Sequence, residues 1–186
     1  MKIEDNFLDQ EKFDELQIFM MGERLDWHYQ KTIDIEEVVG RYQFIHMFYY
    51  TPTPRSGYFE KLNPILNKIN PVSLFRIKAN LLTKTPTIVE NTFHVDILGV
   101  SEEKLKQLTT SIFYINTNNG YTKFEDGTKV ESVANRMLTF PTNMKHSGTA
   151  CTDQKYRIII NFNYFDQSQE LSELQSKGYT KIKLTP

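Results

Sequence analysis

The second half of the chain is a series of short β-prone segments separated by turn residues, and this pattern limits the possible folds most. The segments are rich in β-branched and aromatic residues, and turn signals such as Asp126-Gly127 lie between them. Many short strands joined by tight turns favour two packed sheets around one core, so we predict a mainly β fold. The predicted strands span residues 42–50, 73–83, 109–116, 129–133, 137–140, 144–147 and 155–165.

Apolar residues recur at helical spacing in residues 9–22 and 59–69, and again near the C-terminus in residues 166–177. We predict a helix in each of these segments. A chain of 186 residues has the length of one ordinary domain. We therefore predict a single domain, 1–186, with N-terminal helical and strand support in 1–72, a catalytic core in 73–165 and a C-terminal helix in 166–186.

Composition excludes some classes of partner. The formal net charge of -1 leaves no electrostatic footprint for a nucleic acid. The one cysteine, Cys151, cannot form an intrachain disulfide, and no apolar run is long enough for a membrane span. The first residues include acidic side chains and lack the apolar stretch of a signal peptide. We expect a cytoplasmic protein that contacts neither nucleic acid nor membrane.

Residues 92–96 place an imidazole and a carboxylate two positions apart in a β-prone segment. On a strand, His94 and Asp96 would leave the same face and could converge on one metal ion. His146, which follows another β-prone stretch, is the candidate for a third ligand. Two histidines and one carboxylate are the ligand set of a non-haem Fe(II) site, which leaves coordination positions open for chemistry.

Arg157 opens the β-prone run 157–163, and a cation at the mouth of a buried strand requires an anionic partner. A guanidinium binds a carboxylate through two parallel hydrogen bonds and keeps its charge at neutral pH. The sequence therefore predicts an anion-binding position on this strand.

The order of these residues resembles that of a known family. The three candidate metal ligands and Arg157, with residues 111–116 between them, are similar in order to the motif of the Fe(II)/2-oxoglutarate-dependent dioxygenases. The resemblance is greatest to the prolyl-4-hydroxylase-like branch and its small stand-alone bacterial and phage members. Residues 73–165 carry nearly all of it.

The resemblance implies a double-stranded β-helix, or jelly roll, and a hydroxylase that uses Fe(II), 2-oxoglutarate and O2 and releases succinate and CO2. Its metal ligands would be His94, Asp96 and His146. Arg157 would bind the far carboxylate of 2-oxoglutarate, and Tyr114 falls at the position of a further cosubstrate contact. Thr122 falls near another such position, in a looser match to the family pattern.

Two other classes of protein are compatible with these residues. A zinc-dependent hydrolase could use the same three ligands to activate a water molecule, but it gives Arg157 no evident task. A non-catalytic jelly-roll binding module would leave the ligands as incidental polar residues. For an oxygenase, the substrate could be a peptide, with peptidyl proline as one candidate, or a small molecule.

Three other features complete the sequence interpretation. His28 and His46 are interpreted as structural residues, because a lone histidine on an aromatic strand usually has a hydrogen-bonding role. The polar face of residues 73–83 could point into the site or into water, and water is the favoured interpretation. The loop 51–58, which contains an arginine and a tyrosine, is favoured for substrate recognition over residues 98–107.

Overall fold

The computed structural model describes residues 1–33 and 41–166. Strands are the main regular secondary structure of the described chain, which also has three short helices and one 3-10 turn. The strands are β1 (Lys2–Glu4), β2 (His28–Gln30), β3 (Gln43–Tyr50), β4 (Thr53–Pro54), β5 (Ser73–Thr83), β6 (Leu108–Tyr114), β7 (Tyr121–Phe124), β8 (Lys129–Glu131), β9 (Arg136–Pro141), β10 (His146–Gly148) and β11 (Tyr156–Phe165). The helical segments are α1 (Gln10–Met21), η1 (Phe59–Leu62), α2 (Asn63–Ile69) and α3 (Glu102–Gln107).

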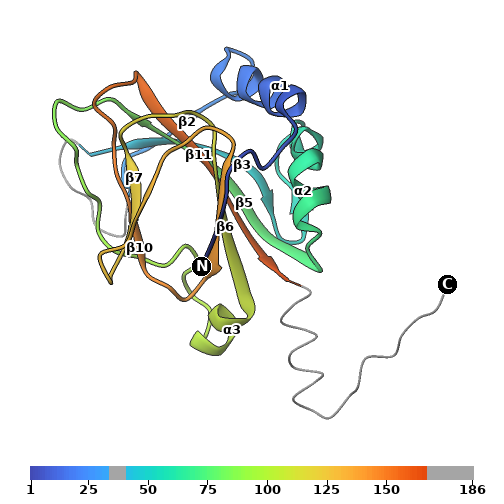
Figure 1. The fold of residues 1–186 in the computed structure, drawn as a ribbon. Helices are drawn as coiled ribbons and strands as arrows, with labels where there is room; N and C mark the ends of the chain where they lie inside the picture. The colour runs from blue at the N-terminus through green and yellow to red at the C-terminus, as the bar shows by residue number, and fades with distance from the viewer. Residues whose placement is uncertain (34–40, 167–186) are drawn as a thin grey trace, which may run out of the picture.

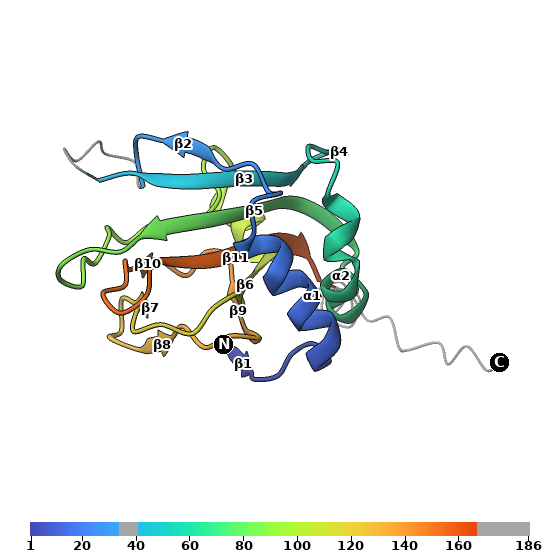
Figure 2. The same ribbon diagram turned by 90° about the horizontal axis from the view of Figure 1, so that it is seen from above.

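The strands form two antiparallel sheets that lie face to face. The large sheet has the order β1-β9-β6-β11-β5-β3-β2, with β4 paired to β3, and the small sheet has the order β10-β7-β8. Figures 1 and 2 show the small sheet against one face of the large sheet and helices α1 and α2 against the other. The predicted mainly β fold, a jelly roll, is therefore confirmed.

The central strand β11 separates two environments because its side chains alternate between the faces of the large sheet. Ile158, Ile160 and Phe162 point into the core beneath the helices. Ile159 belongs instead to the core between the two sheets. Arg157 and Ile159 are two residues apart on β11 and therefore share a face of the sheet. The Arg157 side chain thus also faces the small sheet.

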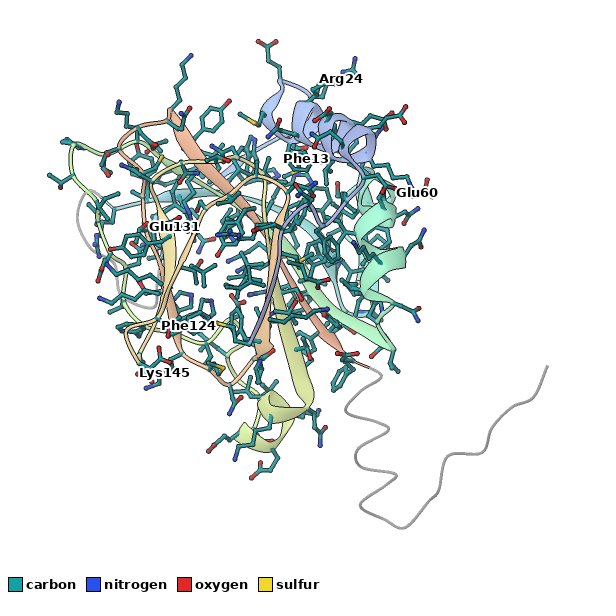
Figure 3. All side chains as sticks on the ribbon, viewed as in Figure 1. Phe13, Arg24, Glu60, Phe124, Glu131 and Lys145 are labelled. Carbon is teal, nitrogen blue, oxygen red and sulfur yellow. The ribbon has the colours of Figure 1, made fainter. Side chains whose placement is uncertain are left out.

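The helices cover the large sheet with an amphipathic face. Phe13 of α1 points toward the sheet. Arg24, which follows α1, and Glu60 of η1 lie at the periphery of the molecule (Figure 3). Fully burying a side chain of this size contributes about 2–3 kcal/mol. The buried residues of α1 are Phe13, Leu16, Phe19 and Met20.

None of the described helices has both the length and the apolar character needed to cross a membrane.

A second, smaller core fills part of the space between the sheets. It contains Phe124 of the small sheet packed edge-to-face on Phe140 of β9, with ring centroids 5.0 Å apart. Such aromatic pairs stabilise beyond their buried area. The other members of this core are Ile112, Tyr114, Val130, Leu138 and Ile159. The remaining space between the sheets is lined by polar groups and holds the candidate site.

The structure confirms most of the predicted elements, including the helix at 9–22 and the strand at 73–83. Strands β1 and β2, which are only three residues each, were not predicted. Residues 92–96 are not a regular strand; within them only His94 forms an isolated bridge. Most of the predicted C-terminal helix, 167–177, lies outside the described residues.

Asn135 should be a stability determinant of this fold. The residue is buried, has a φ of 61°, and joins the N-terminal segment to the turn before β9. Its side-chain oxygen accepts from the Leu8 amide and its side-chain nitrogen donates to the Leu8 carbonyl, both at 2.8 Å. Asn135→Ala removes both bonds and places alanine in the left-handed region. We expect a loss of about 3 kcal/mol.

Urea denaturation of the wild type, Asn135→Ala and Asn135→Gly measures this contribution. Glycine adopts the left-handed conformation without strain but lacks the two side-chain hydrogen bonds. Asn135→Gly should therefore recover about 1 kcal/mol relative to Asn135→Ala. Wild-type stability in both variants would contradict the role assigned to this side chain.

Candidate functional site

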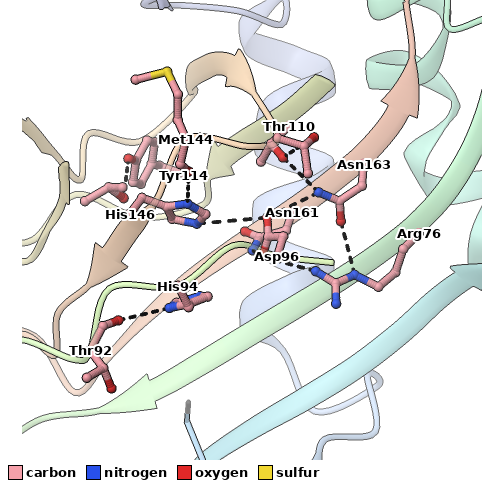
Figure 4. Close-up of polar contacts among 12 residues, drawn as sticks. Arg76, Thr92, His94, Asp96, Thr110, Tyr114, Met144, His146, Asn161 and Asn163 are labelled. Atoms are coloured by element: carbon pink, nitrogen blue, oxygen red, sulfur yellow. Dashed lines mark hydrogen bonds and ion pairs between the residues drawn. The ribbon is translucent and has the colours of Figure 1, made fainter. Parts of the chain in front are cut away.

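Three potential metal ligands converge between the two sheets. Ligand atoms of His94, Asp96 and His146 all lie within 4.8 Å of one another. His146 Nε2 is 4.0 Å from Asp96 Oδ2, and the two imidazole centroids are 5.0 Å apart. Figure 4 shows the three residues, of which Asp96 and His146 are buried and His94 is partly exposed to solvent. The structure thus brings together all three residues that the sequence selected as ligands.

The two histidines are held together by their backbones. His94 and His146 exchange two N–H···O bonds of 3.0 Å, which form an isolated antiparallel bridge at the end of β10. This bridge attaches the irregular segment 92–96 to the small sheet. The expected strand geometry of residues 92–96 is therefore corrected: a single cross-chain bridge, rather than a continuous strand, positions His94.

Each imidazole has a backbone carbonyl on its Nδ1 side. His94 Nδ1 lies 3.0 Å from the Thr92 carbonyl oxygen, and His146 Nδ1 lies 3.3 Å from that of Met144. A carbonyl can only accept, so each Nδ1 carries the proton and each Nε2 carries the lone pair. Burial lowers the pKa of His146, although Asp96 opposes this shift, and the neutral form of the ring is favoured.

Asp96 is held in a cage of donors from the large sheet. Arg76 Nη2 and Asn161 Nδ2 donate to its Oδ1 at 3.1 and 3.0 Å, and Asn163 Nδ2 donates to its Oδ2 at 3.2 Å. Arg76 Nε also donates to the side-chain oxygen of Asn163 at 3.1 Å. These contacts, drawn in Figure 4, fix the carboxylate while leaving it close to the imidazoles.

The electrostatics of the site favour an ionised carboxylate. Burial alone would raise the pKa of Asp96, but Arg76 and the two imidazoles, with a smaller effect of Lys78, hold it below its usual value. A carboxylate that is ionised at neutral pH is ready to bind a metal cation. The donor set of two imidazoles and one carboxylate fits divalent iron.

Arg157 is a fully buried cation without a carboxylate partner among the described residues. Its contacts are neutral: Nε donates to Ser132 Oγ at 2.6 Å, Nη2 to Thr122 Oγ1 at 3.2 Å and Nη1 to the Thr149 carbonyl at 3.5 Å. Burial lowers the pKa of Arg157, and it stays charged because an arginine pKa begins so high. A buried charge without an ionic partner is unfavourable, so this position favours an anionic ligand.

Tyr114 and Thr122 lie beside this cation. The Tyr114 hydroxyl donates to Thr122 Oγ1 at 2.8 Å, and the guanidinium carbon of Arg157 is 5.6 Å from the Tyr114 ring centroid. Burial raises the pKa of Tyr114, so its hydroxyl keeps the proton. Thr122 lines the pocket described below, whereas Tyr114 is absent from its lining and touches Thr122 instead.

One pocket connects the three candidate metal ligands to Arg157. It has about 470 Å³ of space, part of it open to solvent, and its walls include the metal ligands, Thr122 and Arg157. Gly120 is required beside it: a Cβ there would lie 2.7 Å from Cδ of Arg157 and 2.9 Å from the Ala150 carbonyl oxygen. Only a residue without a side chain lets this loop pack on the guanidinium. The remaining wall residues are Ile33, Gln43, Lys78, Asn80, Leu82, Asn91, Ile112, Gly148, Ile159 and Asn161.

Sequence reasoning missed the polar wall that β5 and β11 contribute. Lys78 and Asn80 line the pocket, and Arg76 binds Asp96, so the polar face of β5 points into the site. The interpretation of this face as solvent-exposed is wrong. The signal was present in the alternation of polar and apolar residues, but alternation does not tell which surface the polar face meets.

A second group of possible ligands, Asp26, His28 and His46, lies on the other face of the large sheet. His46 Nδ1 is 2.8 Å from the Asp26 carbonyl oxygen and therefore carries a proton, while Nε2 accepts from Ser56 Oγ at 2.8 Å. No lone pair of His46 remains for a metal. The structural interpretation of His46 is confirmed, and the exposed His28 pairs with Asp26 at 3.0 Å.

The loop 51–58 does not reach the pocket. Neither Arg55 nor Tyr58 belongs to its wall. Tyr58 packs instead on Phe19 of α1, with ring centroids 5.0 Å apart. The favoured role of this loop in recognition has no support in the structure, because the loop is attached to the helical side of the large sheet.

Comparison with known proteins gives a clear result at the level of structure. No family model and no curated protein sequence matches the chain. A Trichoplax adhaerens prolyl hydroxylase, solved with a hypoxia-inducible-factor peptide, superposes with a TM-score of 0.62 at 12% identity over 92% of this chain and 86% of that one. The fold is that of the Fe(II)/2-oxoglutarate oxygenases.

Two further structures with this fold contain ligands. The collagen prolyl hydroxylase of Paramecium bursaria Chlorella virus 1, a 2-oxoglutarate complex, has a TM-score of 0.54 at 16% identity and covers 89% of this chain and 94% of its own. HygX of Streptomyces hygroscopicus, with nickel, 2-oxoglutarate and hygromycin B bound, has a TM-score of 0.56 at 10% identity and covers 89% and 82%. Proteins with this oxygenase fold thus bind both metal and 2-oxoglutarate.

Lys78 should make the stability of the metal-free protein depend on pH. Its pKa falls from 10.5 to about 8, because burial disfavours the charged form and Arg76 repels it, while Asp96 partly compensates. Between these two values the unfolded chain holds a proton that the folded protein has released. Stability therefore rises with pH from about 8 to 10.5, by about 3 kcal/mol for this one group.

Denaturation of the wild type and Lys78→Met at pH 7.5 and 10.5 isolates this contribution. The stability difference between variant and wild type should be about 3 kcal/mol more in favour of the variant at the lower pH. Lys61→Met, which replaces an exposed lysine of η1, is the matched control and should show no such pH dependence. Parallel pH profiles for Lys78→Met and wild type would contradict a partly buried ammonium with a lowered pKa.

Proposed function

We propose that this protein is an Fe(II)- and 2-oxoglutarate-dependent dioxygenase that hydroxylates a substrate and releases succinate and CO2. The observation that carries the proposal is one pocket that joins a His/Asp/His cluster to a buried, anion-seeking arginine. A dicarboxylate that chelates a metal and ends at Arg157 satisfies both features at once. The oxygenase fold is consistent with this assignment.

The proposed metal ligands are His94, Asp96 and His146. Their three protein atoms leave coordination positions for a bidentate cosubstrate and O2, and the bound iron supplies the oxidising chemistry. The chain's own task is to hold the ligands rigidly. The carbonyls on the two Nδ1 atoms and the donors around Asp96 perform this task, as supporting contacts do in metal sites generally.

Arg157 is the proposed partner of the far carboxylate of 2-oxoglutarate, with Thr122 beside it. The planar guanidinium orients a carboxylate through paired hydrogen bonds, and its burial makes the interaction strong. Tyr114 acts in this proposal through Thr122, because its hydroxyl donates to the threonine oxygen. Apolar side chains of Ile112 and Ile159 in the pocket wall exclude water from the cosubstrate.

A zinc hydrolase remains the alternative, but nothing in its reaction needs a buried cation at the end of the pocket. The substrate class is open to both peptides and small molecules, since structures with this fold contain a hypoxia-inducible-factor peptide and hygromycin B. Peptidyl proline stays one candidate. We also propose that residues 1–186 form one oxygenase domain with residues 73–165 as its catalytic core.

We predict that one Fe(II) binds per chain and that His94 is required for it. The purified protein is loaded with Fe(II) under anaerobic conditions, dialysed and analysed for metal. His94→Ala should lose about one equivalent of metal, because two remaining ligands hold iron weakly. His28→Ala, which removes an exposed histidine on the opposite face, is the matched control and should retain it. Equal occupancy in both variants would contradict the ligand assignment.

We predict that Arg157 determines 2-oxoglutarate affinity without affecting the metal. Arg157→Met keeps the volume of the side chain but removes the cation, so the free energy of 2-oxoglutarate binding should weaken by roughly 2–5 kcal/mol. Arg157→Lys keeps the charge but loses the planar fork, and its effect should be smaller. Calorimetry with zinc-loaded protein measures the affinities, and metal analysis checks retention. Unchanged affinity in Arg157→Met would refute the role.

A further inference from the structure

Lys78 occupies an unusual position in the pocket. It lies on β5 directly opposite Asn161 of β11 and lines the same cavity as the metal ligands. Arg157 is opposite Leu82, four residues further along β5. At about 3.3 Å per residue, the backbone positions of the two residues are separated by roughly 13 Å along the sheet. Lys78 therefore serves a different part of the pocket from Arg157.

The ammonium of Lys78 has no anionic partner of its own. No ion pair or hydrogen bond of Lys78 is present within the described residues, and Asp96 is the one acidic residue among those that line the pocket. Asp96 is already bound by Arg76 and two asparagines. A cation placed here destabilises the fold, because burial and Arg76 both oppose its charge.

The charges of the loaded site leave Lys78 uncompensated. A divalent metal is balanced by Asp96 and the near carboxylate of 2-oxoglutarate, and Arg157 is balanced by the far carboxylate. Arg76 and Lys78 then remain as positive charges beside the metal. Arg76 is engaged with Asp96 and Asn163, whereas Lys78 lines the pocket without a hydrogen bond or ion pair among the described residues.

A second polar group in the same place lacks a partner. The side-chain oxygen of Asn161 is buried and has no hydrogen-bond donor within the described part of the chain. The amide cannot simply turn over, because its Nδ2 donates to Asp96 and a reversed amide would set oxygen against carboxylate. Buried acceptors of this kind are normally satisfied, so a bound molecule is expected to donate to it.

We propose that Lys78 binds an acidic group of the prime substrate, and that Asn161 accepts a hydrogen bond from an N–H or O–H of the same molecule. This inference rests on the proposed oxygenase function and narrows its substrate class to acids, with a carboxylate or a phosphate as the group bound. The anion fixes the substrate beside the metal after 2-oxoglutarate has filled the Arg157 end of the pocket.

Anion titrations of the protein loaded with zinc and saturated with 2-oxoglutarate test the proposal at pH 7. Inorganic phosphate and acetate are the probes, so the tighter of the two identifies the acidic group. Calorimetry measures their affinities, and the side-chain nitrogen resonances of 15N-labelled lysines show where they bind. The Lys78 resonance is assigned by its loss in Lys78→Met. We expect it to shift saturably with at least one probe.

The variants separate this site from other anion sites. Lys78→Met should bind the anion at least roughly tenfold more weakly than wild type. Lys78→Arg keeps the charge and should stay within about threefold of wild type. Lys61→Met is the exposed control and should bind like wild type. Binding that persists in Lys78→Met would overturn the proposal.

The outcomes also distinguish this inference from the proposed function. If 2-oxoglutarate does not bind the zinc-loaded protein, the oxygenase assignment fails and the inference fails with it. If 2-oxoglutarate binds but phosphate and acetate shift Lys78 only in its absence, Lys78 is a cosubstrate contact. In that case the inference alone is overturned and the oxygenase assignment stands. A Lys78 shift that survives saturation with 2-oxoglutarate, together with a calorimetric anion affinity that falls in Lys78→Met, supports the substrate site.

Discussion

The buried carboxylate of Asp96 is the contact on which the rest of the site depends. It receives hydrogen bonds from Arg76 on β5 and from Asn161 and Asn163 on β11, so an irregular segment of chain is anchored to the large sheet. The same carboxylate lies 4.0 Å from Nε2 of His146, which belongs to the small sheet. The two sheets therefore meet at this point through polar contacts, and ligand geometry follows from the hydrogen bonds around Asp96.

The space between the sheets is divided into an apolar half and a polar half. The apolar half is closed by aromatic packing between Phe124 and Phe140, which holds the sheets at a fixed separation. The polar half is then kept open, although its polar walls could not stabilise a sandwich by themselves. On the other face of the large sheet, the helices bury a larger core. That core supplies the stability that lets one face of β11 carry Arg157, Asn161 and Asn163.

Arg157 and Lys78 destabilise the ligand-free protein, because each is a cation with little access to water. Burial lowers the pKa of both cations, which means that folding without an anion places each charge in an unfavourable environment. Both side chains nevertheless face one pocket. Residues that weaken the fold without a structural compensation typically mark binding positions, because the ligand provides the missing interaction.

The sequence by itself determined which residues are candidates for the site. The ligand types at His94, Asp96 and His146 and the isolated cation at Arg157 could be selected because metal coordination and charge burial restrict residue type strongly. The alternation along residues 73–83 also identified a strand with one polar face. Only the tertiary structure decided where this face points. The pairing of β5 with β11 sets Lys78 opposite Asn161, and a bridge to His146 positions His94 outside any regular strand. Local periodicity fixes which side chains share a face, but the surface that this face meets depends on pairing between segments far apart in the chain.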